Sequence, residues 1–159
     1  MQQHVATRVT AFDDIRPGMA LPVMRLNIER RDLVRYAGAS DDYVRLHWDL
    51  DFTQQQGFPD VIVHGWLTCA HMLRAVSDWV TPDVAAIASY RIRYHSPLYP
   101  GLLSCGGEVG DITDGMATLD LWARDAADGQ VASASLALVR PPVESDRCTN
   151  WQSEAKGGK

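Results

Sequence analysis

The sequence predicts an α+β fold in which an antiparallel sheet wraps around one central apolar helix. The helix is expected over about His64 to Val80, where apolar side chains cover all but a narrow polar stripe. A helix of this kind must be covered by other parts of the chain. The second half of the chain follows the pattern of four consecutive strands joined by short turns, which is typical of an antiparallel sheet. Wrapping the sheet around the helix is the simplest way to bury both apolar surfaces.

Shorter elements are expected ahead of the central helix. Leu21 to Ile28 predicts one strand, and Glu29 to Ala39 predicts a short helix. Trp48 to Gln56 predicts a second short helix, which is expected to end at Gly57 because glycine readily adopts the left-handed conformation found at helix C-termini. The chain between the two short helices is therefore expected to be a loop.

Turn signals separate the strands of the second half. A Pro-Gly pair precedes the second strand, and Asp-Gly pairs, which favour hairpins, precede the third and the fourth. The first strand alternates aromatic or aliphatic residues with arginine. The four strands are expected at Ala85 to Ser96, Leu102 to Val109, Met116 to Arg124 and Val131 to Arg140.

Length and composition indicate one globular domain. The chain has 159 residues, of which 46% are hydrophobic and 22% are charged. A chain of this size can bury a core without disulfides or a structural metal. The domain is expected over residues 1–143, and the polar stretch 144–159 is expected to be a flexible tail.

Charge and hydropathy argue against several kinds of partner. The net charge of -5 disfavours nucleic acid, since phosphate binding needs a basic face. No stretch reaches the about 18 apolar residues of a membrane span, and the N-terminus lacks the apolar core of a signal peptide. Cys69, Cys105 and Cys148 are widely spaced and fit neither a disulfide framework nor a zinc site. We therefore expect a cytoplasmic protein without a membrane or nucleic-acid partner.

Candidate catalytic groups gather in the segment Ser40 to Asp49, SDDYVRLHWD. Asp42 and His47 lie five residues apart, which is too far for one helical face but is easily bridged by a loop. A carboxylate and an imidazole can together hold one water and exchange its protons, as a hydration reaction requires. The alternative interpretation is that Asp42 ends a helix and His47 lies on a surface loop.

A second candidate site lies where the central helix begins, in the run FPDVIVHGW from Phe58 to Trp66. The N-terminus of a helix presents free N–H groups and a partial positive charge. Gly65 would let a carbonyl group approach the backbone closely, as an oxyanion hole requires. The alternative is that Gly65 only relieves crowding and that His64 caps the helix or packs against it.

Two stretches of the chain resemble the motifs of the MaoC-like acyl dehydratases, the (R)-specific enoyl-CoA hydratases of the hot-dog fold. Tyr36 to His47 is similar to the first motif, and Asp42 and His47 take the positions of its catalytic aspartate and histidine with the family spacing. The run GFPDVIVHG, from Gly57 to Gly65, is similar to the second motif, which opens the central helix. The resemblance covers roughly residues 21–140.

The first motif departs from the family pattern at three positions. Asp41 stands where the family has glycine, and Val44 and Arg45 replace an Asn-Pro pair that shapes the catalytic loop. Arg45 brings a positive charge near the expected site. It is therefore a candidate to contact an acidic substrate, and the alternative is that it points into solvent.

The resemblance implies a trans-2-enoyl thioester as substrate, carried on coenzyme A or on an acyl carrier protein. Asp42 and His47 would hold the attacking water, and the N–H of Gly65, next to His64, would polarise the thioester carbonyl. Trp66 is a candidate for the acyl pocket. No metal or redox cofactor is implied, and coenzyme A enters only as part of the substrate.

The resemblance also implies a homodimer whose sheets join edge to edge, with coenzyme A crossing the subunit boundary. Arg91 and Arg93 share the polar face of one strand and are candidates for its phosphates, or else ordinary solvated charges. Three alternatives stay open. One is a non-catalytic or partner-dependent subunit of a heteromeric dehydratase, and another is a specialised dehydratase that acts on an unusual acyl group. The third is a hot-dog thioesterase, which would use a carboxylate on or near the helix, where only Asp78 is present, far from the N-terminus.

Overall fold

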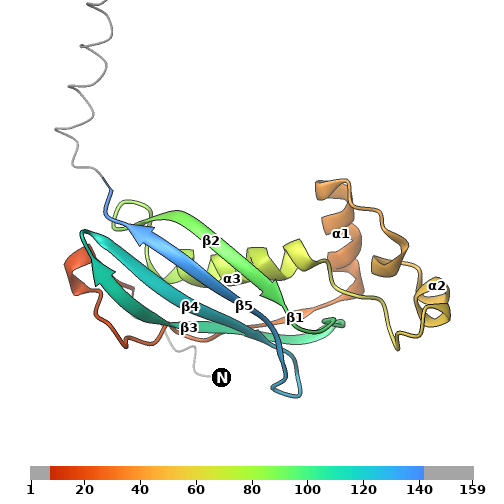
Figure 1. The fold of residues 1–159 in the computed structure, drawn as a ribbon. Coiled ribbons are helices and arrows are strands. Elements are labelled where there is room, and N and C mark those ends of the chain that lie inside the picture. The colour runs from red at the N-terminus through yellow and green to blue at the C-terminus, as the bar shows by residue number, and fades with distance from the viewer. Residues whose placement is uncertain (1–7, 142–159) are drawn as a thin grey trace, which may run out of the picture.

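A curved antiparallel sheet wraps around one long helix in the computed structural model, which describes residues 8–141 (Figure 1). The strands are β1 (Met24–Ile28), β2 (Ala86–Tyr94), β3 (Gly101–Thr113), β4 (Met116–Arg124) and β5 (Gln130–Val139). The helices are α1 (Arg30–Ser40), α2 (Leu50–Gln55) and α3 (Gly65–Trp79), with two 3-10 turns, η1 (Phe12–Asp14) and η2 (Arg45–His47). The predicted α+β class and the predicted central helix are confirmed.

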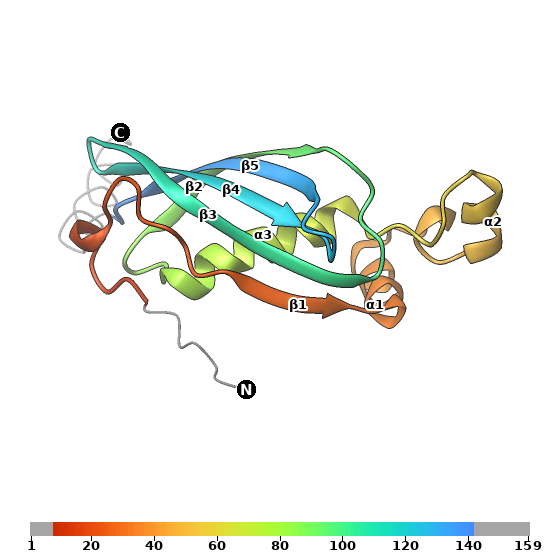
Figure 2. The ribbon, with the colours of Figure 1, turned by 90° about the horizontal axis from the view of Figure 1, so that it is seen from below.

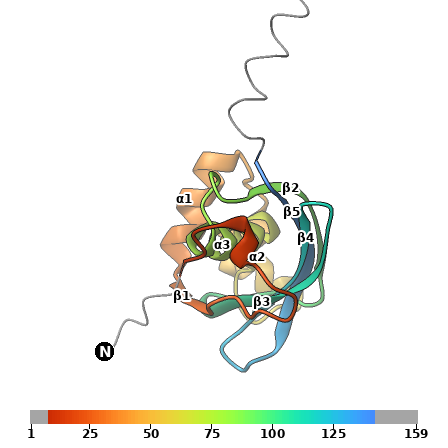
Figure 3. The ribbon, with the colours of Figure 1, turned by 90° about the vertical axis from the view of Figure 1, so that its left-hand side faces the viewer.

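The sheet has the strand order β1-β3-β4-β5-β2, and every neighbouring pair is antiparallel. β1 and β2 are therefore its two edges. β2 follows α3 in the chain and lies beside β5, with Arg91 opposite Ser135 and Tyr94 opposite Ala132. Seen along α3, the sheet curves around the helix from one edge to the other (Figure 3).

The core lies between α3 and the concave face of the sheet. Met72, Val76 and Trp79 of α3 are all at most 2% exposed and belong to the same buried cluster as Leu103 and Leu119 of the sheet. The exposed side of α3 carries Arg74 and Asp78, as the predicted polar stripe requires. Toward the N-terminus of the helix, the same side carries two apolar residues, Trp66 and Ala70, which are also exposed. One side of the first turns of α3 is therefore apolar and uncovered in the single chain.

The short elements differ from their predicted bounds for local reasons. α2 begins at Leu50 rather than Trp48 because the Asp49 side chain accepts a hydrogen bond from the amide of Phe52 at 3.0 Å and caps the helix. β1 begins at Met24 instead of Leu21, after Pro22, which has no N–H to donate to a neighbouring strand. The segment predicted as a loop between α1 and α2 contains the turn η2.

The segment from α1 to α2 projects beyond the sheet at the end where α3 begins (Figure 2). None of the helices within residues 8–141 has the length and apolarity that a bilayer crossing demands. The predicted boundary between a domain ending at residue 143 and a tail over 144–159 lies outside the described residues.

Replacing Leu103 by alanine is expected to destabilise the fold by about 2–5 kcal/mol, because the side chain is fully buried and its removal leaves a cavity. Leu102, its neighbour in β3, is 41% exposed and provides the matched control. Leu102→Ala should change the free energy of unfolding by less than about 1 kcal/mol. Urea unfolding of both variants tests the assignment, and equal losses would contradict the inward orientation of Leu103.

Candidate active site

The candidate site lies at the N-terminal end of α3, where the segment after α1 meets the chain that enters this helix. Asp42 follows α1 directly, because Asp41 adopts a left-handed conformation with φ of 58° and ends the helix. His47 closes the turn η2, and His64 is the residue before α3. Two segments separated by about twenty residues of sequence thus converge at one helix terminus.

The Asp42 carboxylate faces the His47 ring. Its Oδ2 lies 3.9 Å from Nε2 of His47, while its Oδ1 accepts a long hydrogen bond of 3.4 Å from the amide of Val44. A separation of 3.9 Å is too long for a direct hydrogen bond and suits two groups that share one bound water. The structure therefore brings together the acid and the imidazole that the sequence predicts as a pair.

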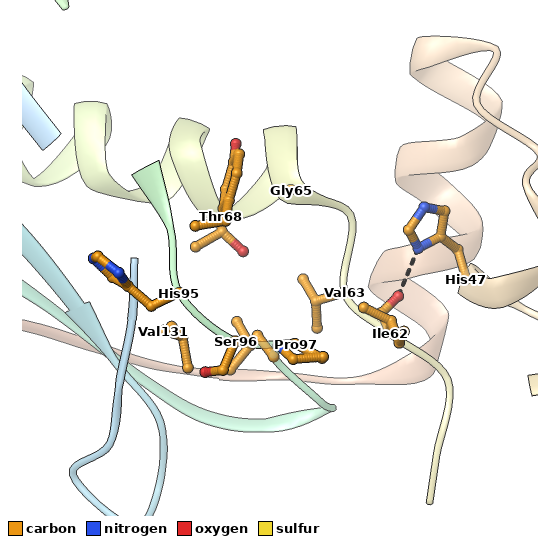
Figure 4. A pocket seen from close by; sticks show the side chains of 11 residues that line it. His47, Ile62, Val63, Gly65, Thr68, His95, Ser96, Pro97 and Val131 are labelled. Carbon is orange, nitrogen blue, oxygen red and sulfur yellow. Dashed lines mark hydrogen bonds between the residues drawn. The ribbon is translucent and has the colours of Figure 1, made fainter. Parts of the chain in front are cut away.

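The position of His47 defines which of its ring nitrogens carries a proton. Nδ1 lies 2.7 Å from the carbonyl oxygen of Ile62 (Figure 4). A carbonyl only accepts hydrogen bonds, so Nδ1 must be the donor, and Nε2 of the neutral ring then has a free lone pair. This lone pair faces Asp42, so the pair offers two proton acceptors to a water between them.

His64 supports both members of the pair from behind. Its ring is 1% exposed, stacks on the His47 ring with centroids 3.8 Å apart, and lies 3.2 Å through Nε2 from the backbone oxygen of Asp42. Burial lowers the pKa of His64 below its ordinary value, so the ring is neutral at neutral pH. His64 therefore contacts Asp42 and His47 rather than the cavity beside them.

A cavity of about 370 Å³ opens beside this group. Its walls come from the chain entering α3, the first turns of this helix and the segment that leaves β2. It is lined by His47, Ile62, Val63, Gly65, Thr68, Tyr94, His95, Ser96, Pro97, Leu98 and Val131. Figure 4 shows His47 at one end of this lining and His95 at the other. Mostly apolar walls with a few polar groups are typical of a site for an organic ligand.

Gly65 begins α3 and contributes backbone to the cavity wall. The first N–H groups of a helix have no partner within it, so they are available to an oxygen atom in the cavity. A Cβ at position 65 would lie 3.1 Å from Cζ of Tyr94, closer than ordinary van der Waals contact. Burial raises the pKa of Tyr94 to about 12, so its hydroxyl stays protonated at neutral pH.

Two of the predicted site residues lie away from this centre. Arg45 forms an ion pair of 2.7 Å with Asp49, and its guanidinium stacks 4.2 Å from the ring centroid of Phe52. The Trp66 side chain points out of the cavity lining and is 58% exposed. Neither residue reaches the Asp42–His47 pair within this chain.

The sequence pattern did not single out His95 and Ser96, which the structure places in the cavity wall. They follow the end of β2, and only the position of this strand at the sheet edge brings them into the cavity that His47 also lines. The one signal in the sequence was the Ser-Pro pair that ends the predicted strand.

Asp42, His47 and His64 each offer one ligand atom within 4.8 Å of the others, the spacing of a possible metal site. Two of the four histidine nitrogens already face carbonyl oxygens, and the two rings are stacked with an interplanar angle of 22°. The nitrogens that face no carbonyl are Nε2 of His47 and Nδ1 of His64, so these atoms and the Asp42 carboxylate are the groups that would bind an ion.

Comparison with known proteins places the chain in a family. The family model described as MaoC like domain matches residues 15–104, which is more than half of the chain. The chain is 29% identical over 117 residues to the 3-oxo-4,17-pregnadiene-20-carboxyl-CoA hydratase beta subunit of Mycobacterium tuberculosis, covering 73% of this chain and 90% of that protein. It is 30% identical over 91 residues to Protein MaoC of Klebsiella aerogenes, covering 57% of this chain and only 27% of that protein.

Solved structures show the same architecture. The ChsH1-ChsH2 complex from Mycobacterium tuberculosis contains a chain with a TM-score of 0.72 and 29% identity, covering 78% of this chain and 97% of that one. The R-hydratase PhaJ1 from Pseudomonas aeruginosa has a TM-score of 0.75 at 20% identity, covering 84% and 86%, and at this identity it supports the hot-dog fold alone. Because the family model matches residues 15–104, from just after η1 to the first residues of β3, this chain belongs to the MaoC-like dehydratase family.

Proposed function

We propose that the chain catalyses the reversible syn addition of water to the double bond of a trans-2-enoyl-CoA, giving a 3-hydroxyacyl-CoA. Membership of the MaoC-like family supports hydratase or dehydratase chemistry in general. The observation that carries the finer proposal is the 3.9 Å gap between Asp42 Oδ2 and His47 Nε2, beside the cavity that Gly65 lines. The gap accommodates one shared water next to a helix terminus that can stabilise negative charge.

In the proposed reaction the thioester oxygen accepts a hydrogen bond from the N–H of Gly65. This contact draws electrons from the double bond and makes the β-carbon electrophilic. The oxygen of the water held by Asp42 and His47 bonds to the β-carbon, and the proton it loses passes to this pair. The pair returns a proton to the α-carbon on the same face, so the enolate collapses to the product without a metal or redox cofactor.

A second copy of the chain is the proposed partner. β2 is an open edge strand, and Ile87, Tyr90 and Tyr94 along it are 38%, 42% and 47% exposed. Trp66, on the adjoining side of α3, is also exposed. Unpaired strand edges next to apolar side chains favour pairing with another chain, and two copies joined through β2 would form one continuous sheet.

The main alternative is a subunit that needs a different partner chain. The similarity to a protein named as a hydratase beta subunit and to a chain of the ChsH1-ChsH2 complex motivates this alternative. Measuring crotonyl-CoA hydration by the purified chain alone distinguishes an enzyme that is active by itself from a subunit that needs a different partner. Hydration by the chain alone supports the proposal, whereas an inert chain that a second protein activates would favour the subunit.

A thioesterase has less support. Such an enzyme would use a carboxylate on or near the central helix, and the only acidic residue of α3 is Asp78. Asp78 lies in the last turn, where Arg74 approaches its carboxylate at 3.4 Å, at the opposite end from Gly65. Cleavage of crotonyl-CoA to free coenzyme A in the same assay would overturn this assignment.

Asp42→Asn and His47→Gln should each lower kcat for crotonyl-CoA hydration by about 10²- to 10⁴-fold, because each removes a proton acceptor from the water site. The loss of enoyl absorbance measures the rate, and circular dichroism checks that the variants fold. Asp41→Asn is the matched control, since asparagine tolerates the left-handed backbone at this position. Full activity in Asp42→Asn would remove the basis of the mechanism.

Gly65→Ala should lower kcat/KM by about tenfold or more, because the new methyl group crowds Tyr94 and shifts the amide that meets the thioester oxygen. Gly38→Ala is the control. Its Cβ would meet the Tyr43 hydroxyl at an ordinary 3.8 Å, and alanine stabilises a helix interior by up to about 1 kcal/mol. Steady-state kinetics of both variants should separate them, and an unaffected Gly65→Ala enzyme would argue against the oxyanion role.

The purified chain should sediment as a dimer with twice the 17.6 kDa mass of the chain. Ile87→Glu should weaken this dimer, because it places a charge at the open edge of β2. Met116→Glu changes a residue that is similarly exposed, at 42%, on β4 and should leave the dimer intact. Analytical ultracentrifugation measures both, and a wild-type chain that stays monomeric at micromolar concentration would contradict the homodimer.

A further inference from the structure

Tyr94 brings a phenol hydroxyl to the first turn of α3. It is the last residue of β2 and lies opposite Ala132 of β5, which is fully buried. Ile92, two residues earlier in β2, packs against the core. Residues that lie opposite one another, or two apart along one strand, share a face of the sheet. The Tyr94 side chain therefore points toward α3 and stays on the inner face when the backbone of β2 pairs with another strand.

The Tyr94 hydroxyl lies close to the amide of Gly65. A Cβ at position 65 would be 3.1 Å from Cζ of Tyr94 and 3.3 Å from its hydroxyl oxygen. Because a Cβ is about 2.5 Å from the amide nitrogen of its own residue, the hydroxyl oxygen is at most about 6 Å from the Gly65 nitrogen. Two donors this far apart can both reach one oxygen between them, at about 2.7–3.2 Å each.

Gly65 and Tyr94 line the same cavity, and His47 lines it too. Within residues 8–141 the Tyr94 hydroxyl takes part in no hydrogen bond, so its O–H is free to bind a ligand in the cavity. Burial raises the pKa of Tyr94 to about 12. The hydroxyl is therefore protonated at neutral pH and can donate a hydrogen bond. The cavity thus offers a backbone donor and a side-chain donor close together, beside the catalytic pair.

We infer that the Tyr94 hydroxyl is a catalytic donor, which binds the thioester oxygen together with the N–H of Gly65. The inference rests on the proposed function and deepens it. When water adds to the β-carbon, negative charge develops on the thioester oxygen, and donors aimed at that oxygen lower the energy of the enolate. Tyr94 keeps its own proton throughout. The proton that reaches the α-carbon still comes from the Asp42–His47 pair.

A purely structural role for Tyr94 makes a different prediction. The ring of Tyr94 packs against Gly65, and this packing needs the ring but not the hydroxyl. Tyr94→Phe removes one oxygen atom and keeps the ring, so it separates the two roles. Tyr90 provides the matched control, because it lies on the same face of the same strand but not in the cavity lining.

Tyr94→Phe should lower kcat for crotonyl-CoA hydration by about 10²-fold and change KM by less than about twofold, because the lost hydrogen bond is strongest in the transition state. Tyr90→Phe should keep the wild-type kcat and KM. Circular dichroism and urea unfolding check that both variants fold. A wild-type kcat in Tyr94→Phe would overturn the inference and leave Tyr94 with a packing role alone.

The absorption spectrum of a bound thioester tests the contact itself. 2,4-Hexadienoyl-CoA absorbs at longer wavelength when hydrogen bonds polarise its thioester carbonyl. Bound to Asp42→Asn, which retains both donors, it should show this red shift, and the Asp42→Asn/Tyr94→Phe double variant should show a smaller one. Adding Tyr90→Phe to Asp42→Asn should leave the shift unchanged. An equal shift in all three variants would overturn the contact.

The two measurements keep this inference distinct from the proposed function. Hydration by the wild-type chain that does not depend on the Tyr94 hydroxyl would remove the second donor and leave the proposed function standing. The reverse outcome is a chain that does not hydrate crotonyl-CoA but whose bound hexadienoyl-CoA loses its red shift when Tyr94 is replaced by phenylalanine. The proposed reaction would then fall, and the contact between Tyr94 and the thioester oxygen would stand.

Discussion

Two histidine rings connect the segment between α1 and α2 to the chain that enters α3. His47 contacts the carbonyl of Ile62 at 2.7 Å, His64 lies 3.2 Å from the carbonyl of Asp42, and the two rings stack. Each ring belongs to one segment and reaches the backbone of the other, so the segments hold each other in place. The direction of the Asp42 carboxylate, the proton on Nδ1 of His47 and the access to Gly65 all depend on this reciprocal contact.

The contact is stable because α3 is held by the core. The helix is buried along most of its length against the concave face of the sheet, which fixes where its first residue lies. A buried His64 has a lowered pKa and stays neutral, so it adds no positive charge behind His47. The apolar scaffold thus determines the position of the polar groups at its end and keeps His64 neutral.

The same sheet serves two different surfaces. Its inner face packs on α3, and its outer face at β2 and β5 presents arginine and serine to solvent. Strand alternation allows this division, because successive side chains point to opposite faces. His95, at the end of β2, lines the inner cavity, and its Nε2 lies 2.8 Å from the hydroxyl oxygen of Ser133 on β5.

The sequence by itself determined the elements and the identity of the acid–imidazole pair. An apolar helix, alternating strands and Asp-Gly turns are local patterns, and each appears in the structure close to its predicted place. The resemblance of two stretches to the family motifs also singled out Asp42, His47 and Gly65 as candidates. Bounds such as the start of α2 were less well predicted, because a single capping hydrogen bond from Asp49 decides them.

Only the tertiary structure decided which residues surround that pair. His64 is buried and contacts both His47 and the backbone of Asp42. Arg45 forms an ion pair with Asp49, and the Trp66 side chain is exposed. The cavity wall includes Tyr94, His95 and Ser96 because β2 lies at the edge of the sheet, next to β5. No local sequence pattern predicts the order of strands in a sheet. Long-range packing, which joins residues distant in sequence, fixes these neighbours, so no periodicity or spacing within one segment can reveal them.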